Sequence, residues 1–362
     1  MAPTDRGREY VSPFNSISLE DSPSVSLQRE IENQVLSAVS QFASSLNSGR
    51  NVVSDMSALI EVTSRLSLSN LDNWERLIRQ GLYQASANSK PATWKFWNQP
   101  TPFLTWIDLC SGDGFKRERT LRALSGTAPN RFFFAMATRR LNDWVPQVRA
   151  AACEKLPSLA FASKPEDIVD VLCAVFPHWN SWGRMDADGK QTLLKIASIG
   201  AVTHSLKSRL VSATAGPLAS VLVQAGQTSV LDADLPEIAS NAIQPSVRAR
   251  AYKSLLDGKV VWLAGRKWEW TDIRYCKGYF KPVLCDRPLC VKSPLVETLR
   301  AASVDRSAAV RRVAADVLIR ESGTIGSVAL QMAALLASDS HPSVAERGNF
   351  ALKKLSQMVP SA

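Results

Sequence analysis

Residues 317–355 read "VLIRESGTIGSVALQMAALLASDSHPSVAERGNFALKKL", and this stretch decides the predicted fold. It contains two apolar patterns with helical spacing, separated by the polar turn "SDSHPSV". Proline suits the first turn of a helix, because its missing N–H would have no partner there in any case. The stretch therefore predicts a helix, a short turn and a second helix.

Three earlier stretches follow the same pattern, so the chain repeats itself. Each ends one helix, turns through polar residues, usually with a proline, and starts another helix at a valine followed by small residues and leucine. The four stretches are residues 137–156, 238–256, 300–318 and 335–355. Their key valines are Val148, Val247, Val310 and Val344.

The spacing of these valines fits a single repeat length. Val310 and Val344 lie 34 residues apart, and the gap of 99 residues from Val148 to Val247 is about three repeats. The 63 residues from Val247 to Val310 fit one repeat and an insertion. Because one helical hairpin cannot bury its own apolar stripe, we expect the hairpins to stack side by side.

The repeated turn resembles that of the HEAT-repeat family, in which Asp-x-x-Pro-x-Val-Arg precedes Ala and Leu. The matching residues are Asp143, Pro146, Val148 and Arg149; Pro245, Val247 and Arg248; Asp305, Val310 and Arg311; and Asp339, Pro342 and Val344, with the arginine displaced to Arg347. The resemblance covers roughly residues 104–362. It implies an all-α fold, an α-solenoid of HEAT-like helical hairpins, and it is silent about activity.

The resemblance also implies a structural role for the motif arginines. In HEAT-like stacks the arginine after the key valine often pairs with an aspartate of a neighbouring turn. Arg149, Arg248 and Arg311 occupy that position here, and Asp143 and Asp305 are the available partners. These arginines are therefore not counted as partner-binding charge.

Composition divides the chain into segments. Residues 1–26 are rich in Ser, Pro and Asp and are expected to be a flexible lead-in. Helical patterns predict N-terminal helices over residues 27–90, and residues 91–103 form a linker rich in Pro and Trp. The remaining segments are HEAT-like repeats at 104–256, a basic aromatic insertion at 257–294 and HEAT-like repeats at 295–362.

The chain is basic, with a formal net charge of +10. Residues 241–320 contain sixteen Lys or Arg and seven Asp or Glu, a local net charge of +9. This favours an acidic partner, either DNA, RNA or an acidic protein surface. No apolar run approaches the roughly 18 to 20 residues that cross a bilayer, so no membrane partner is expected. Six scattered cysteines and the lack of a secretory pattern favour a reducing cytoplasm.

The insertion interleaves aromatic and basic side chains. Its segments "KVVWLA" and "KWEWTDIRY" have strand propensity, and Gly265-Arg266 between them predicts the turn of a short β-hairpin. The cations can neutralise phosphates while the aromatics stack on bases. Equally, the aromatics can pin a loop against the helices while the cations stay solvated. The candidate nucleic-acid-binding residues are Arg250, Lys253, Arg266, Lys267, Trp268, Trp270, Arg274, Tyr275, Lys277 and Lys281.

No catalytic constellation is identified, and neither a metal nor a cofactor is predicted. The insertion holds Cys276, Cys285 and Cys290, but a closed zinc site needs four ligands, so we interpret them as buried free thiols. The fragment "RMDADGKQT" lacks the closing ligands of a calcium loop, and "CSGDGF" lacks the lysine of a phosphate loop. Both are interpreted as turns.

These features predict a non-enzymatic helical-repeat binding scaffold that engages nucleic acid or another acidic partner through residues 241–320. The chain also fits a subunit of a larger complex, with a docking surface near Trp97 and Phe103 or with those residues in the core. An enzymatic alternative is a HEAT-like DNA glycosylase for alkylated bases, with Glu269 or Asp272 as its carboxylate. The oligomeric state is left open.

Overall fold

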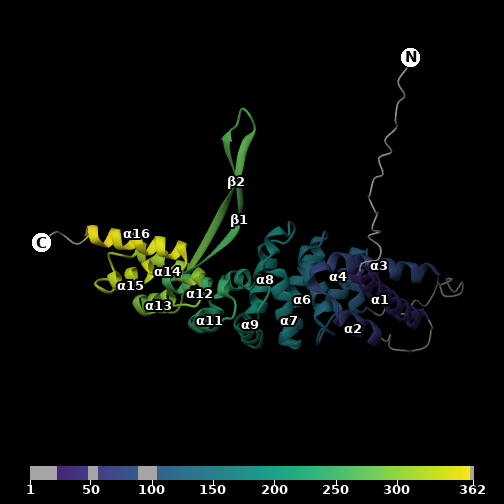
Figure 1. Ribbon diagram of the computed structural model, residues 1–362. Coiled ribbons are helices and arrows are strands. Elements are labelled where there is room, and N and C mark those ends of the chain that lie inside the picture. Colours follow the sequence, from purple (N-terminus) through teal and green to yellow (C-terminus); the bar gives the residue numbers. More distant parts are fainter. Residues whose placement is uncertain (1–22, 48–55, 89–103, 359–362) are drawn as a thin grey trace, which may run out of the picture. The chain divides into compact units, whose positions relative to one another are not determined.

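The computed structural model of the protein describes residues 23–47, 56–88 and 104–358 (Figure 1). This part of the chain consists of sixteen α-helices, several short 3₁₀ helices and one two-stranded antiparallel sheet. The prediction of a mostly helical protein is therefore confirmed. None of the helices in these residues is both long and apolar enough to span a bilayer.

The chain divides into two compact units. The described part of the first unit contains α1 (Pro23–Asn47), α2 (Ser57–Ser64) and most of α3 (Leu71–Asn88). α1 begins four residues before the expected start at residue 27 and packs against α2. The rest of the expected lead-in and the linker at 91–103 lie outside the described residues.

The second unit contains residues 66–72 and the described chain from residue 104 onward. Its helices before the sheet are α4 (Gly114–Ala123), α5 (Arg131–Arg139), α6 (Pro146–Ala162), α7 (Pro165–Val175), α8 (Ala187–Ala197), α9 (Gly200–Ser212), α10 (Leu218–Ala225), α11 (Leu235–Asn241) and α12 (Pro245–Asp257). The helices after the sheet are α13 (Leu295–Ser303), α14 (Ala308–Arg320), α15 (Val328–Ala337) and α16 (Pro342–Met358). The 3₁₀ helices are η2 (Leu68–Asn70), η3 (Trp106–Cys110), η4 (Arg140–Asn142), η5 (Trp179–Ser181) and η6 (Ser229–Asp234).

The helices of the second unit pack in two alternating sets. α4, α6 and α8 contact one another in turn, as do α5, α7 and α9, and the same relation links α10, α12, α14 and α16. Each of these helices therefore covers part of the apolar side of the helix two places before it. The key valines of the repeated turns, Val148, Val247, Val310 and Val344, are all fully buried.

Helix starts follow the repeated turn, as predicted. α6, α12 and α16 begin at Pro146, Pro245 and Pro342. α14 has no proline at this point and begins after Ser307 instead, whose hydroxyl oxygen accepts a hydrogen bond from the N–H of Ala309. A serine cap and a first-turn proline are two solutions to the same problem, because both deal with N–H groups that have no partner inside the helix.

The two polar fragments singled out in the sequence are also helix starts. Asp186, in "RMDADGKQT", accepts a hydrogen bond from the N–H of Gly189 and caps α8. Asp113, in "CSGDGF", accepts one from the N–H of Phe115 and caps α4. The interpretation of both fragments as turns therefore holds only for the residues just before each helix, because residues 187–192 already belong to α8 and Gly114 and Phe115 to α4.

An aspartate closes three of the repeated turns in the same way. The side chains of Asp143, Asp305 and Asp339 each accept a hydrogen bond from the backbone N–H two residues further along the chain. Such local bonds hold the backbone in the turn and satisfy a donor close to the helix start. The motif aspartates are therefore part of the turn itself.

Two of these aspartates receive an arginine from the preceding helix pair. Two nitrogens of Arg248 donate to the two carboxylate oxygens of Asp305, each at 2.9 Å. Arg311 and Asp339 form the same two-bond arrangement, at 2.5 and 2.9 Å. The prediction that motif arginines pair with an aspartate of a neighbouring turn is confirmed for Arg248 and Arg311.

Arg117 extends the series to Asp143, although the sequence motif does not include it. Its guanidinium donates to both oxygens of Asp143 at 2.7 and 2.9 Å. Arg149 departs from the prediction, because it donates to the backbone oxygen of Asp143 in its own turn. We call the three pairs Arg117–Asp143, Arg248–Asp305 and Arg311–Asp339 the arginine–aspartate ladder.

α15 and α16 approach each other closely at Gly348. A Cβ atom at this position would lie 2.2 Å from the backbone nitrogen of Ala337 and 2.4 Å from the carbonyl carbon of Leu336. Real Cβ atoms do not come this close to a backbone, so the helix pair can close only around a glycine.

The sheet is a single long hairpin inserted between α12 and α13. β1 (Lys259–Asp272) pairs antiparallel with β2 (Lys277–Pro288). We call residues 259–288 the arm, because they extend away from the helices in Figure 1. α12 still packs against both α13 and α14. The arm is therefore an insertion between consecutive helices, as the spacing of the valines predicts.

The turn predicted at Gly265-Arg266 is wrong. β1 runs straight through these residues, and only the register shifts between Leu263 and Gly265, where Ala264 has no partner on β2. A bulge of this kind absorbs a glycine without reversing the strand. The hairpin is consequently much longer than the short one expected.

The arm reverses direction at its tip without any glycine or proline. The Asp272 side chain accepts hydrogen bonds from the N–H groups of Arg274 and Tyr275. Cys276 adopts a left-handed backbone with φ 51°, and its N–H donates to the oxygen of Ile273. Aspartate side chains that bond the next residues in this way can replace the usual turn formers.

Candidate functional site

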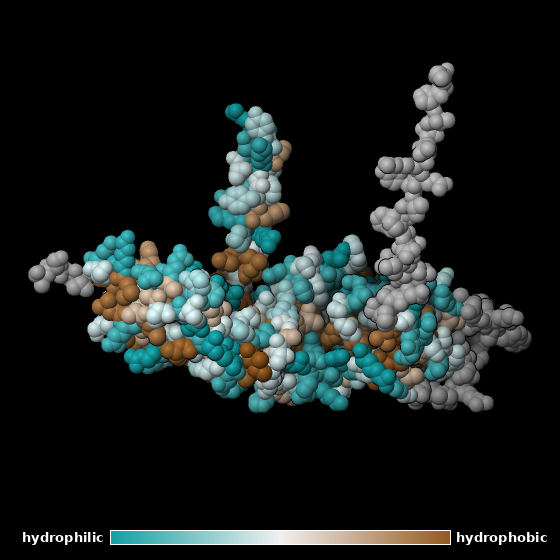
Figure 2. Space-filling model, viewed as in Figure 1, coloured by the Kyte–Doolittle hydropathy of each residue, from teal (hydrophilic) through white to brown (hydrophobic). Residues whose placement is uncertain are grey.

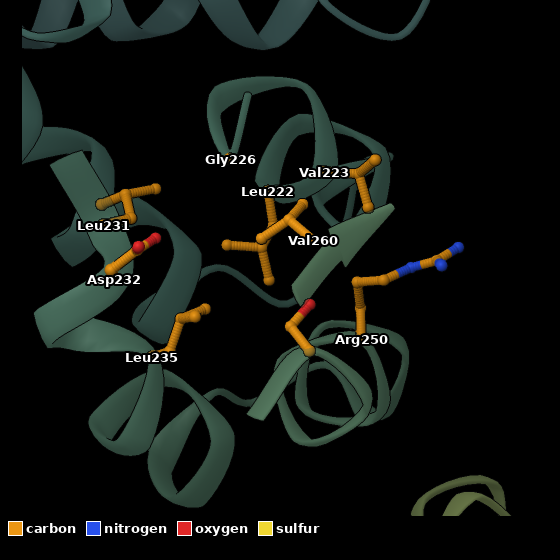
Figure 3. Close-up of a pocket in the computed structure, with 9 residues that line it drawn as sticks. Leu222, Val223, Gly226, Leu231, Asp232, Leu235, Arg250 and Val260 are labelled. Carbon is orange, nitrogen blue, oxygen red and sulfur yellow. The ribbon is translucent and has the colours of Figure 1, made fainter. Parts of the chain in front are cut away.

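The root of the arm is buried against α10 and α12. Val260 of β1 lies beside Leu222 and Val223 of α10 (Figure 3). The space left among the residues here is about 10 Å³, which holds at most one water molecule. The root is therefore a packing interface.

Arg287 fixes β2 to η6. Its guanidinium forms two hydrogen bonds with the Asp232 carboxylate, at 2.6 and 2.9 Å. It also donates to the backbone oxygens of Gly226 and Thr228. Only 16% of the Arg287 side chain and 3% of the Asp232 side chain are exposed. This cation of the insertion therefore anchors the arm and does not face a partner.

Two further hydrogen bonds brace the root. The N–H of Leu289 donates to the oxygen of Gly258 at 2.9 Å, so the chain leaves the arm beside the point where the arm begins. The side chain of Asn180, in η5, donates to the backbone oxygen of Leu263 at 3.0 Å. Beyond this brace lies the distal half of the arm, residues 265–283, whose side chains are mostly exposed.

One side of the distal half is aromatic. Paired residues of an antiparallel ribbon point to the same side, and so do residues two apart on one strand. Trp268 pairs with Phe280, and Trp270 lies two residues further along β1. We call these three residues the aromatic face. The root appears brown in Figure 2, whereas the distal half is mostly teal and pale, because the Kyte–Doolittle index ranks Trp and Tyr below the aliphatic residues.

The three rings form one cluster. The ring centroid of Trp268 lies 5.4 Å from that of Trp270 and 5.0 Å from that of Phe280, with interplanar angles of 83° and 72°. The central residue, Trp268, is 37% exposed, whereas Trp270 and Phe280 are 52% and 61% exposed. Large rings that cluster outside the core are typical of an interaction surface.

The opposite side of the ribbon carries most of the charge. Lys267 pairs with Lys281 in the register, and Glu269 pairs with Tyr279. Lys281 forms an ion pair with Glu269 at 3.0 Å, and this hydrogen bond raises the pKa of Lys281. We call this side, which also includes Lys277, the basic face.

Four cations of the distal half form no ion pair with any residue that the structure describes. They are Arg266, Lys267, Arg274 and Lys277. The whole arm contains seven Lys or Arg and three Asp or Glu, a net charge of +4. The Lys277 ammonium lies 5.7 Å from the ring centroid of Tyr275, which is itself largely exposed. The arm therefore offers positive charge together with exposed rings.

The structure brings eight of the ten candidate residues together on the distal half of the arm. They are Arg266, Lys267, Trp268, Trp270, Arg274, Tyr275, Lys277 and Lys281. The other two, Arg250 and Lys253, lie on α12. Arg250 points away from Val260 (Figure 3). Lys253 is engaged by Asp257 at 2.9 Å, and Asp257 also pairs with Arg320.

One residue of the aromatic face, Phe280, and the glycine beneath the Trp268 ring, Gly278, are missing from the sequence-based candidates. Phe280 lies opposite Trp268, and a Cβ atom at Gly278 would lie 2.6 Å from two ring carbons of Trp268. Their only signal is the register of the hairpin, which cannot be read correctly once the turn is placed at residues 265–266.

The two carboxylates of the enzymatic alternative do not join the tryptophans. Glu269 points to the basic face and pairs with Lys281. Asp272 is occupied by the backbone N–H groups of the tip. A glycosylase carboxylate beside a stacked base is therefore not the arrangement found on the arm.

The three cysteines of the insertion are free thiols but are exposed, so the prediction that they are buried is wrong. The reason is that Cys276 lies at the tip and Cys285 on the ribbon, where no helix covers them. Within the part of the chain that the structure describes, no three or more His, Cys, Asp or Glu gather in a way that would hold a metal ion.

The docking surface considered near Trp97 and Phe103 lies outside the described residues. The neighbouring Trp106 is buried, and its ring centroid lies 6.5 Å from that of Phe133. Trp106 therefore belongs to the core.

Comparisons with known protein families, with curated proteins and with solved structures found no match. The functional assignment of this chain therefore depends on its own residues, above all on the arm.

Proposed function

We propose that the protein is a non-enzymatic helical-repeat scaffold, similar to HEAT-repeat proteins, that binds nucleic acid through the distal half of its arm. The observation that carries the proposal is the two-sided arm. Three clustered, exposed rings lie on one side together with Arg266, whereas Lys267 and Lys277 lie on the other side and Arg274 lies at the tip. Nucleic acid has the two matching chemistries, since it presents phosphates to the cations and bases to the rings.

The helical part supports the scaffold class. The alternating sets of helices place each helix against the one two places before it, and the arginine–aspartate ladder joins turns of the same design. This is the arrangement expected of stacked helical hairpins. Insertions in repeat proteins occur mostly on one face of the stack, and this is often the face that binds the partner.

The anchor of the arm supports a binding role for its far end. Arg287, Val260 and Asn180 fix the root through contacts inside the protein. Among the described residues, Arg266, Lys267, Arg274 and Lys277 of the distal half have no ion-pair partner, and more than half of Trp270 and Phe280 is exposed. The cross-strand pair of Trp268 and Phe280 helps to hold the two-stranded ribbon together, and the ring surface that remains exposed is open to a partner.

An acidic protein is the competing partner, because it offers charge of the same sign. The rings favour nucleic acid, since the aromatic face is a cluster of separate ring surfaces and stacking on bases uses them directly. A glycosylase activity has no support from the arm, because Glu269 and Asp272 point away from the aromatic face.

Binding of labelled DNA and RNA oligonucleotides, followed by fluorescence anisotropy at about 50 mM salt, tests the proposal. The informative variant is the double substitution Lys267→Ala/Lys277→Ala. The matched control is Arg300→Ala/Arg312→Ala, which removes the same charge from exposed positions on α13 and α14, also within residues 241–320.

The arm variant is expected to bind more weakly and to lower the slope of log affinity against log salt by about 1 per residue. The control is expected to change both much less. If the wild-type protein binds neither single strands nor duplexes, the proposal is wrong and a protein partner replaces it. Equal weakening by both variants would show that net charge acts without the arm, and would also reject it.

A further inference from the structure

We infer that the nucleic acid taken by the arm is single-stranded, with unpaired bases stacked on Trp270 and Phe280. The inference rests on the proposed function and specifies its ligand. Trp268 lies between the two outer rings and contacts both. Each outer residue leaves more than half of its surface exposed, whereas Trp268 does not. The cluster therefore offers two open ring surfaces supported by a central one.

Gly278 shows that the central ring has a fixed place. The Trp268 ring lies over Gly278 on the opposite strand, so close that a Cβ atom there would lie 2.6 Å from ring carbons Cε2 and Cζ2. The ring thus rests on the bare backbone of β2. This seat makes Trp268 a positioning residue, which holds Trp270 and Phe280 apart and in place.

The composition of the arm argues against reading a duplex. A two-stranded ribbon can enter the major groove, where Arg or Lys reads guanine and Asn or Gln reads adenine through hydrogen bonds to base edges. The arm contains no Asn or Gln. Of its arginines, Arg287 is used at the root, so only Arg266 and Arg274 remain. In a duplex the bases also stack on each other, so their faces are not accessible to the aromatic side chains. A single strand can turn its bases outward and expose those faces.

The positions of the free cations fit a strand that crosses the aromatic face. Arg266 points to the same side as Trp268 and lies on the root side of the cluster. Arg274 lies in the turn at the tip, just beyond Trp270. Cations therefore stand before and after the two open rings along the ribbon. Phosphates flanking two stacked nucleotides would meet them there.

A second copy of the chain is a poorer occupant. Its arm would bring the same net charge of +4 against the first, and like charges repel across an interface. A polyanion removes this cost, and a single strand also supplies flat apolar surfaces for the rings. The exposed rings and the charge thus select the same ligand.

The test compares a single-stranded oligonucleotide with a duplex of the same length, using Trp270→Ala and Phe280→Ala. The matched control is Tyr279→Ala, which removes an exposed ring from the basic face. Each aromatic-face substitution is expected to weaken single-strand binding by about 5- to 150-fold, with the salt slope unchanged. Tyr279→Ala is expected to have a much smaller effect, and Trp270→Phe to restore most of the binding.

A second variant keeps every ring but disturbs their arrangement. Gly278→Ala pushes Trp268 from its seat and is expected to weaken single-strand binding while leaving the salt slope intact. Circular dichroism and the melting temperature of each variant establish that the helices remain folded. Because the arm lies outside the helix pairs, these readouts are expected to stay as in the wild type.

The outcomes separate the inference from the proposed function. If the duplex binds as tightly as the single strand, and Trp270→Ala and Phe280→Ala act no more strongly than Tyr279→Ala, the inference is wrong while nucleic-acid binding stands. If neither oligonucleotide binds, both are wrong. If the wild-type protein prefers the single strand, and Trp270→Ala and Phe280→Ala abolish this preference, the result supports both the inference and the proposed function.

Discussion

Arg248 and Asp305 lie 57 residues apart in the chain, yet they form a buried pair with two hydrogen bonds of 2.9 Å. The Arg248 side chain is only 1% exposed, and its remaining nitrogen donates to the backbone oxygens of Ala242 and Ile243. The pair spans the whole arm in sequence. It joins the turn before α12 to the turn before α14, so the helices are tied together past the insertion.

Replacing Arg248 should destabilise the protein strongly. Arg248→Met leaves the Asp305 carboxylate buried without its partner, which costs about 3–5 kcal/mol of unfolding free energy. The double variant Arg248→Met/Asp305→Leu should recover part of this loss, because it leaves no unpaired charge. Urea unfolding measures both. Arg122→Met, which breaks an exposed pair, is the control and should change stability much less. Equal losses from the two arginines would refute a special role for the ladder.

Acid should weaken two pairs of the ladder, Arg117–Asp143 and Arg311–Asp339. The hydrogen bond from Arg311 is the main reason why the pKa of Asp339 lies below its ordinary value of 3.8. For Asp143, burial raises the pKa, but hydrogen bonds from Arg117 and Val145 outweigh it and leave the pKa lowered. A carboxyl with a lowered pKa in the folded state stabilises the fold above its unfolded pKa. That contribution is lost as the pH falls through the folded value.

We therefore expect the unfolding free energy to be insensitive to these groups near neutral pH and to fall below about pH 4. Asp339→Asn should flatten this decline, since it removes one group that binds a proton on unfolding. Urea unfolding at a series of acid pH values measures the slope. An unchanged slope in Asp339→Asn would mean that its pairing with Arg311 does not contribute to stability.

Gly348→Ala should destabilise the protein even though alanine is the better helix former. Helix propensity alone predicts a gain of about 1 kcal/mol. The new methyl group would overlap the backbone of α15 at Ala337, and overpacking typically costs about 1–3 kcal/mol. Gly200→Ala is the matched control, because a Cβ atom there meets nothing within 4 Å. Thermal unfolding measures both variants, and only Gly348→Ala should have a lower melting temperature than the wild type. A rise at both positions would contradict the close helix contact.

Arg287→Lys should loosen the arm without melting the helices. Lysine keeps the charge but cannot reproduce the two-bond fork to Asp232 and the bonds to two carbonyl oxygens. The rate of hydrogen exchange at the backbone amides measures this loosening. The rate should rise in β1 and β2 and stay unchanged in α14 and α16. Glu269→Gln, which breaks the exposed pair with Lys281, should leave exchange nearly as it is. Similar exchange in both variants would show that Arg287 is no anchor.

The helical part was predictable because its signals are local. A first-turn proline at Pro146, Pro245 and Pro342 marks a helix start whatever surrounds it. The valine that follows, at Val148, Val247 and Val344, is fully buried in each case. The pairing of Arg117 with Asp143 was not predicted, because it depends on how two helix pairs stack. The segment around Arg117 also lacks the valine of the motif.

The arm was predicted as an insertion with strands, but its geometry was not. Gly265 is a strong turn signal, yet it lies beside a bulge. The true turn depends on the Asp272 side chain, which is a weaker signal because aspartate occurs in many settings. Placing the turn too early hides the pairing of Trp268 with Phe280. Eight of the ten candidate residues still fall on the distal half, because basic and aromatic composition alone identifies the segment.

The hydrogen bond between Leu289 and Gly258 closes the neck of the hairpin. The polypeptide thus departs from the helices and returns to them at nearly one point, so the distal half could be shortened or exchanged while the root, with Val260 and Arg287, is kept. The scaffold and the appendage are in this sense interchangeable parts. A ribbon of different length or chemistry could be grafted onto the same neck, and this ribbon onto another host, with the helices themselves left untouched.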